Sequence, residues 1–154
     1  MSRVYYAAFE GISVSAAQDL FELQAPADAT VVVRRITVTN ETSETSEQLA
    51  IAVKRGEGTI TSGSGGGTVT PVPMSKGDPA FGGTVERNNT TKAVAGTGAI
   101  KVLHREGFNV VGSGFDWHGE IQISPSDYAI VELIGAPASA LTLSGVMVFE
   151  EIGG

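Results

Sequence analysis

The chain has 154 residues, a formal net charge of −7 and no cysteine, and only 18% of its residues are charged. This length suits a single core, so we expect one domain over residues 1–154. The lack of cysteine excludes disulfides, thiolate metal sites and a cysteine nucleophile. The acidic balance argues against a nucleic-acid partner, because phosphate binding requires clustered Lys and Arg. The nearest approach to a cluster is Arg34-Arg35, which we interpret as a solvated strand edge.

The sequence predicts neither a membrane span nor a secretion signal. No apolar run approaches the roughly 20 residues that cross a bilayer. Residues 1–6 lack the charged leader and apolar stretch of a signal peptide. We therefore expect a protein that is made in the cytoplasm and has no membrane partner.

Apolar and polar residues alternate with a period of two along much of the chain, which is typical of half-buried strands. In the segment from Gln48 to Lys54, for example, Leu49, Ile51 and Val53 share one face. The segments predicted as strands are residues 4–9, 20–23, 31–39, 48–54, 84–87, 99–104, 120–123, 131–133 and 141–149. Short strands at this spacing, about eight or nine of them, predict an all-β sandwich or barrel, and we expect a single antiparallel β-sandwich with almost no helix.

The last predicted strand is apolar on both faces. Leu143, Met147 and Phe149 share one parity, while Val146 and Val148 are apolar on the other. Such a strand is either covered on both sides within the domain or buried at a subunit contact. We predict the second arrangement, in which Val146 and Val148 bind another copy and form a homo-oligomer, most simply a trimer.

Residues 61–83 are rich in glycine and proline, which excludes a central strand. A loop of about twenty residues is long for a compact domain. Two interpretations stay open: a disordered surface excursion, or an arm that orders on a neighbouring subunit. In the second, Val72, Met74 and Phe81 are the anchors. Because surface loops carry few core contacts, we expect deletion of residues 62–82 to leave the fold intact.

No catalytic or metal-binding pattern is complete in the sequence. The spacing from Gly112 to His118 resembles the start of the first metal motif of the cupins, but Glu120 stands where that motif needs a second histidine. His104 is the other histidine, and three ligands cannot be assembled from these residues. The glycine run at residues 63–67 lacks the Lys-Ser/Thr ending of a phosphate loop. We therefore predict no metal, no cofactor and no enzymatic activity.

The single tryptophan, Trp117, opens the strand predicted at residues 120–123. One interpretation is that its ring closes the core at one end of the sandwich. The other is that it anchors a protein interface, where tryptophan is over-represented. Trp117 is therefore a candidate partner-binding residue together with Met74, Phe81, Val146 and Val148.

Several stretches together resemble the small jelly-roll virion proteins of tailed bacteriophages. They are residues 6–23 (YAAFEGISVSAAQDLFEL), 33–39, 46–51, the glycine-rich loop, and residues 143–152 (LSGVMVFEEI). The resemblance covers nearly the whole chain, but it consists of apolar and turn residues and includes no catalytic signature.

The resemblance implies that the sandwich is an eight-stranded jelly roll. It also implies a trimeric decoration or cement protein that binds the major capsid protein on the outside of a phage head and stabilises the virion. Three alternatives stay open. One is a tail or fibre component, such as a receptor-binding head. Another is a carbohydrate-binding module, although only 6% of residues are aromatic. The third is a cupin-like enzyme.

Overall fold

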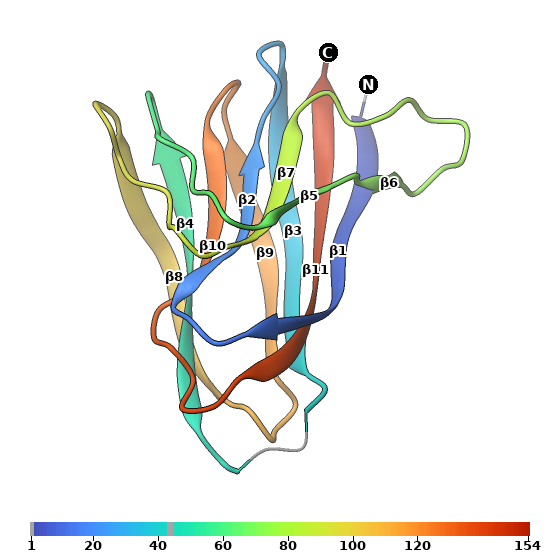
Figure 1. The fold of residues 1–154 in the computed structure, drawn as a ribbon. Coiled ribbons are helices and arrows are strands. Elements are labelled where there is room, and N and C mark those ends of the chain that lie inside the picture. The colour runs from blue at the N-terminus through green and yellow to red at the C-terminus, as the bar shows by residue number, and fades with distance from the viewer. Residues whose placement is uncertain (1, 43–44) are drawn as a thin grey trace.

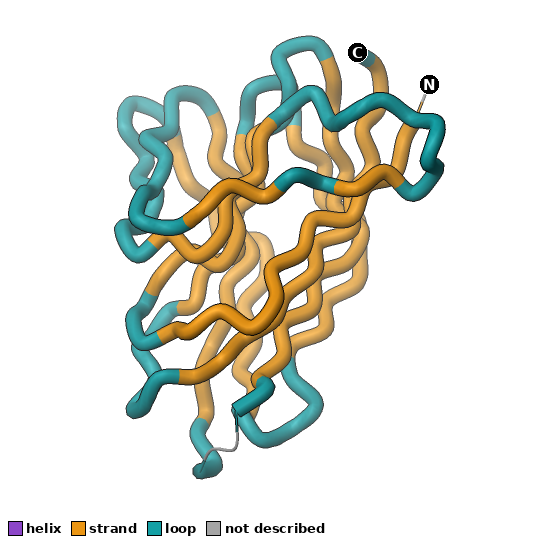
Figure 2. Tube along the Cα trace, turned by 45° about the vertical axis from the view of Figure 1, so that its right-hand side comes forward, coloured by secondary structure: helices purple, strands orange, loops and turns teal. Residues whose placement is uncertain are grey.

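The structure is a computed structural model that describes residues 2–42 and 45–154, and within these ranges it contains strands and turns but no helix (Figures 1 and 2). The strands are β1 (Ser2–Val14), β2 (Gln18–Gln24), β3 (Ala29–Asn40), β4 (Gln48–Glu57), β5 (Gly67–Val69), β6 (Val72–Pro73), β7 (Thr84–Asn89), β8 (Ala99–Asn109), β9 (Phe115–Ile123), β10 (Tyr128–Leu133) and β11 (Leu141–Gly153). Every segment predicted as a strand lies within one of them.

The strands form two antiparallel sheets. The five-stranded sheet has the order β6-β1-β11-β3-β9, and the six-stranded sheet has the order β5-β7-β2-β10-β4-β8. Without β5, β6 and β7, the quartets β1-β11-β3-β9 and β2-β10-β4-β8 remain. The chain changes sheet at each step except from β4 to β8, which is the order of an eight-stranded jelly roll. The predicted all-β sandwich is confirmed.

The core lies between the sheets, where the inward-facing side chains of both meet. Tyr5 and Phe149 stack at 5.6 Å between ring centroids, and Phe9 packs against Phe21 at 5.1 Å. Gly145 makes room for this second pair, since a Cβ at that position would lie 2.4 Å from the Phe9 ring. Alternating apolar residues thus fill one continuous core, as the period-two pattern predicts.

The pair Arg34-Arg35 does not lie on a strand edge, so that interpretation was wrong. β3 lies between β11 and β9, and its register shifts between Val33 and Arg35 against both neighbours. Such a bulge inserts one extra residue and reverses the alternation beyond it. Val33 and Ile36 therefore both face the core, while both arginines lie on the outer side of a central strand.

The glycine-rich segment is built into the fold, so the interpretation as a disordered excursion was wrong. β5 pairs with β7, β6 pairs with β1, and Thr61 and Ser64 bridge to Val94 and Thr91. Figure 1 shows the chain between β4 and β8 crossing one side of the sandwich before it returns. Glycine and proline exclude a central strand here, as predicted, but they are compatible with short edge strands.

Candidate functional site

The outer side of the five-stranded sheet carries an apolar surface, which we call the apolar face. It consists of Val4, Tyr6, Ala8, Val72, Met74, Val146 and Val148. Tyr6 lies opposite both Val72 and Val148, and Ala8 lies opposite Val146. Residues directly opposite each other in neighbouring antiparallel strands project to the same side of the sheet. The Met74 backbone N–H extends this surface by donating to the Val4 carbonyl at 2.8 Å.

These side chains are accessible to a partner. Val72 is 62% exposed, Met74 is 64% exposed and Tyr6 is 41% exposed. A shallow depression of about 220 Å³ lies between Tyr6, Val146 and Val148, and Arg35 and Thr37 line it as well. Contiguous exposed apolar surface with a concave centre is a common property of protein interaction sites.

The charged groups beside the apolar face are paired with one another. Arg34 contacts Glu120 and donates to Glu150 at 2.5 Å, and Arg35 contacts Asp116 at 3.1 Å. The hydrogen bond from Arg34 holds the pKa of Glu150 below its usual value. Arg35 lowers the pKa of Asp116 in the same way. The two arginines therefore offset two of the three carboxylates named here, which leaves this rim less negative than its acidic residues alone would make it.

The structure divides the five predicted partner-binding residues into two groups. Met74, Val146 and Val148 lie together on the apolar face. Phe81 does not, and its prediction as an exposed anchor was wrong. Its ring packs in the core at 4.8 Å from the Phe149 ring and 5.5 Å from the Tyr5 ring.

Trp117 is also absent from the apolar face. It lies on β9, partly buried against the core, at the opposite edge of the sandwich. Conversely, sequence analysis missed Tyr6 as part of the face. The sequence signal for Tyr6 was weak. The alternation of Tyr5 and Tyr6 indicates that one of the two tyrosines faces outward, but it does not show which residues of other strands that tyrosine contacts.

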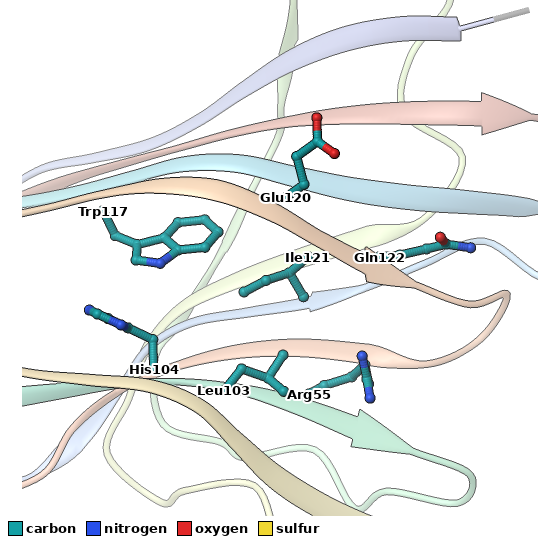
Figure 3. Close-up of a pocket in the computed structure, with 7 residues that line it drawn as sticks. All are labelled: Arg55, Leu103, His104, Trp117, Glu120, Ile121 and Gln122. Carbon is teal, nitrogen blue, oxygen red and sulfur yellow. The ribbon is translucent and has the colours of Figure 1, made fainter.

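A cleft of about 500 Å³ opens between β8 and β9, where the two sheets end on the same side (Figure 3). Its lining is Arg55, Leu103, His104, Trp117, Glu120, Ile121 and Gln122. Figure 3 shows Trp117 and Ile121 descending from β9, with His104 and Leu103 on the facing wall. The side chains of Glu120 and Gln122 point away to the rim.

The outer side of the six-stranded sheet is covered by the chain between β4 and β8. The covered residues include a small apolar cluster around Ile130 and Tyr128 and, beside it, two carboxylates. Asp19 and Glu22 are 1% and 3% exposed. Glu22 accepts hydrogen bonds from the Gly63 N–H at 2.9 Å and from the Asn89 amide at 3.0 Å. Asp19 accepts one from the Ala93 N–H at 2.8 Å. These carboxylates attach the covering segments to the sheet.

Burial raises the pKa of Asp19 to about 7, and a hydrogen bond with Glu22 contributes, while the Ala93 N–H opposes the shift. A perturbed buried carboxyl can mark a catalytic site. Here, however, the covering chain closes over it, and the described residues include no group of three or more His, Asp, Glu or Cys that could hold a metal ion. The cluster is a structural attachment for the covering chain.

Comparison with known proteins gives little further information. No family model matches the sequence, and no curated protein matches it. Solved structures with some likeness are those of infectious bursal disease virus, Gx strain (15% identity, TM-score 0.16) and Gt strain (14%, 0.16), and T=1 particles derived from infectious bursal virus (14%, 0.15). Each match covers 99% of this chain but only 41–42% of the other. At these TM-scores the likeness carries no argument about fold or function.

Fold and site together define a class of protein: a jelly-roll domain in which the chain between β4 and β8 covers the outer face of one sheet, while the outer face of the other sheet is uncovered and apolar.

The part of the chain that the structure describes contains no helix long and apolar enough to cross a membrane.

Proposed function

We propose that the protein is a structural subunit that assembles with further copies of itself through the apolar face and works on the surface of a virion. The observation that carries this proposal is the uncovered apolar face on β6, β1 and β11. The exposed side chains of Val72, Met74 and Tyr6, lying side by side, are unfavourable in water on a monomer but are typical of a contact between subunits.

Electrostatics favour the same surface. Two copies that each carry a net charge of −7 repel one another. Contact is least costly where the charges are already paired, and at the rim of the apolar face Arg34 pairs with Glu150 and Arg35 with Asp116. Burial of apolar area then contributes roughly 25 cal/mol per Å² towards association.

The virion setting rests on the resemblance of the sequence to decoration proteins of tailed phages. The jelly-roll topology is compatible with that role. A trimer bound to the major capsid protein would attach at many equivalent positions, so that individually weak contacts give durable binding. A tail or fibre position is the alternative, and a contact between copies suits it equally.

The first test addresses the contact between copies. We expect wild-type protein to sediment as an oligomer, and Val146→Lys with Val148→Lys to sediment as a folded monomer with an unchanged circular dichroism spectrum. Val102→Lys is the matched control, because Val102 is 60% exposed but lies on β8, away from the apolar face. A wild type that is monomeric at micromolar concentration would refute the proposal.

The second test addresses the setting. Purified protein is mixed with intact phage heads and, separately, with tails, and the bound fraction is measured after pelleting. Binding to heads supports decoration. Binding to tails or cells but not to heads replaces it with the fibre alternative.

A further inference from the structure

We propose that the cleft between β8 and β9 binds a neutral saccharide, with a sugar ring packed on the indole of Trp117. This site lies on the opposite edge of the sheet from β6, and it is independent of the contact between copies.

The indole is held in place by the strand that carries it. Trp117 and Gly119 are two residues apart on β9, so both project towards the cleft side. A Cβ at position 119 would lie 2.6 Å from Cζ2 of the indole and 3.1 Å from Cη2. Glycine is thus what allows the ring to lie along the strand at this point. A ring fixed in this way offers a flat apolar surface of the kind on which the C–H face of a sugar packs.

The remaining lining alternates apolar and polar groups. Ile121 and Leu103 project into the cleft from facing walls (Figure 3), and Leu103 is 40% exposed. His104 and Arg55 lie around them, and the amide of Gln122 lies at the rim. A purely apolar ligand would leave these polar groups unpaired, which is costly. A ligand with one apolar face and a ring of hydroxyl groups satisfies both kinds of lining.

The charges of the cleft favour a neutral ligand over an ionic one. The Arg55 guanidinium is held by Glu57 at 2.8 Å, and Glu57 is also contacted by Lys101 at 2.8 Å. Glu120 is paired with Arg34. An anion would have to compete with Glu57 for Arg55, and a cation would have to compete with Arg34 for Glu120. Hydroxyl groups can bond to both without separating either pair.

The edges on either side do not favour an added peptide strand. Lys101, Arg105 and Glu106 on β8, and Asp116 and Glu120 on β9, place charges along both edge strands. Charged edges are a common protection against pairing with another strand. A small ligand between the sheets is therefore the better occupant.

Trp117 is the single tryptophan of the chain, so its fluorescence reports directly on the cleft. The probes are cellotriose, maltotriose, triacetylchitotriose and a neutral-glycan array. We expect at least one neutral saccharide to give a saturable fluorescence change at millimolar concentration or below. Inorganic phosphate and N-acetylneuraminic acid are expected to give none.

Variants localise the site. Gly119→Ala displaces the indole and is expected to weaken binding about tenfold. Gly107→Ala is the matched control on β8, because a Cβ there meets only the Leu49 carbonyl, at 3.6 Å. Trp117→Leu should abolish binding measured by calorimetry. Trp117→Phe keeps an aromatic face and core packing, so it should retain partial binding if Trp117→Leu fails to fold.

Three results would overturn the proposal: no neutral saccharide binds at millimolar concentration, only the anionic probes respond, or Gly119→Ala and Trp117→Phe both bind as wild type does.

Discussion

The two outer faces of the sandwich differ in what covers them, since one buries carboxylates beside a small apolar cluster and the other leaves apolar side chains exposed. On the six-stranded sheet, Asp19 and Glu22 are buried beneath the chain between β4 and β8. On the five-stranded sheet, Tyr6, Val72 and Met74 are exposed. Buried carboxylates are tolerated because backbone N–H groups of the covering chain bond to them. The covered face is complete within one chain, whereas the apolar face is left uncovered, and in the proposed assembly another copy covers it.

The largest effect on stability is expected from removing the residue that anchors the covering chain between its two ends. Phe81→Ala should lower the free energy of unfolding by about 2–4 kcal/mol, because its ring fills space beside Tyr5 and Phe149. Urea unfolding measures the loss. Lys76→Ala, from the same segment but exposed and outside the apolar face, is the control and should change stability by less than about 0.5 kcal/mol. Equal effects would mean that Phe81 does not join the core.

The hydrogen bonds of the covered face should matter more to folding than the apolar face does. Glu22→Ala leaves the Gly63 N–H without its acceptor and removes one of two acceptors of the Asn89 amide, which keeps Glu86, at a cost of about 1–3 kcal/mol. Tyr6→Ala should cost a monomer less than about 1 kcal/mol but weaken association between copies. Stability and sedimentation are measured on both variants. The comparison fails if Tyr6→Ala unfolds the protein more readily than Glu22→Ala does.

The covered face should also make stability depend on pH. Burial raises the pKa of Asp19 to about 7, above its ordinary 3.8. The folded state therefore holds a proton that the unfolded state releases between about pH 4 and 7. The stabilisation that this bound proton gives to the folded state is full below pH 4 and is lost as pH rises through 7. The variant Asp19→Asn has no carboxyl to ionise, so it lacks this loss of stability at high pH. It should be more stable than the wild type at pH 8 by about 1–3 kcal/mol. Thermal unfolding from pH 4 to 8 checks it, and an unchanged profile in Asp19→Asn would contradict it.

The smallest effect is expected at the rim of the apolar face. Arg35 lowers the pKa of Asp116. This ion pair therefore stabilises the folded state above the ordinary pKa of an aspartate, and the stabilisation is lost as pH falls. Because both side chains are exposed, Asp116→Asn should change stability only slightly, and 1 M salt should erase the difference. A large, salt-resistant loss would show that the pair lies in a buried contact, such as the one between copies.

The sandwich was predictable because its signal is local. Alternation along β4, β9 and β11 is visible residue by residue, and it fixes which side chains face the core. Val146 and Val148 were found in the same way, as the residues that violate the alternation of a one-sided strand. Their neighbours Tyr6 and Val72 were not grouped with them, because the pairing of β1 with β6 and β11 joins positions far apart in sequence.

The errors have the same origin. Glycine and proline in residues 61–83 show that the segment cannot be a central strand, but they do not show that Phe81 reaches Tyr5 and Phe149. The deletion of residues 62–82 is therefore now expected to destabilise the fold, since it removes Phe81 and the Gly63 N–H that bonds to Glu22. Arg34-Arg35 was misplaced because a bulge leaves no local mark in composition.

The position of β11 bears on when the protein becomes able to associate. This strand leaves the ribosome last of the eleven, yet it inserts between β1 and β3 and carries Val146 and Val148. Until it is made, the five-stranded sheet lacks its central member. Pairing of the two strands most distant in sequence is a slow step, since it closes the longest loop in the chain. Chains that lack β11 would therefore have no finished apolar face, and the proposed assembly would wait until β11 is made and paired.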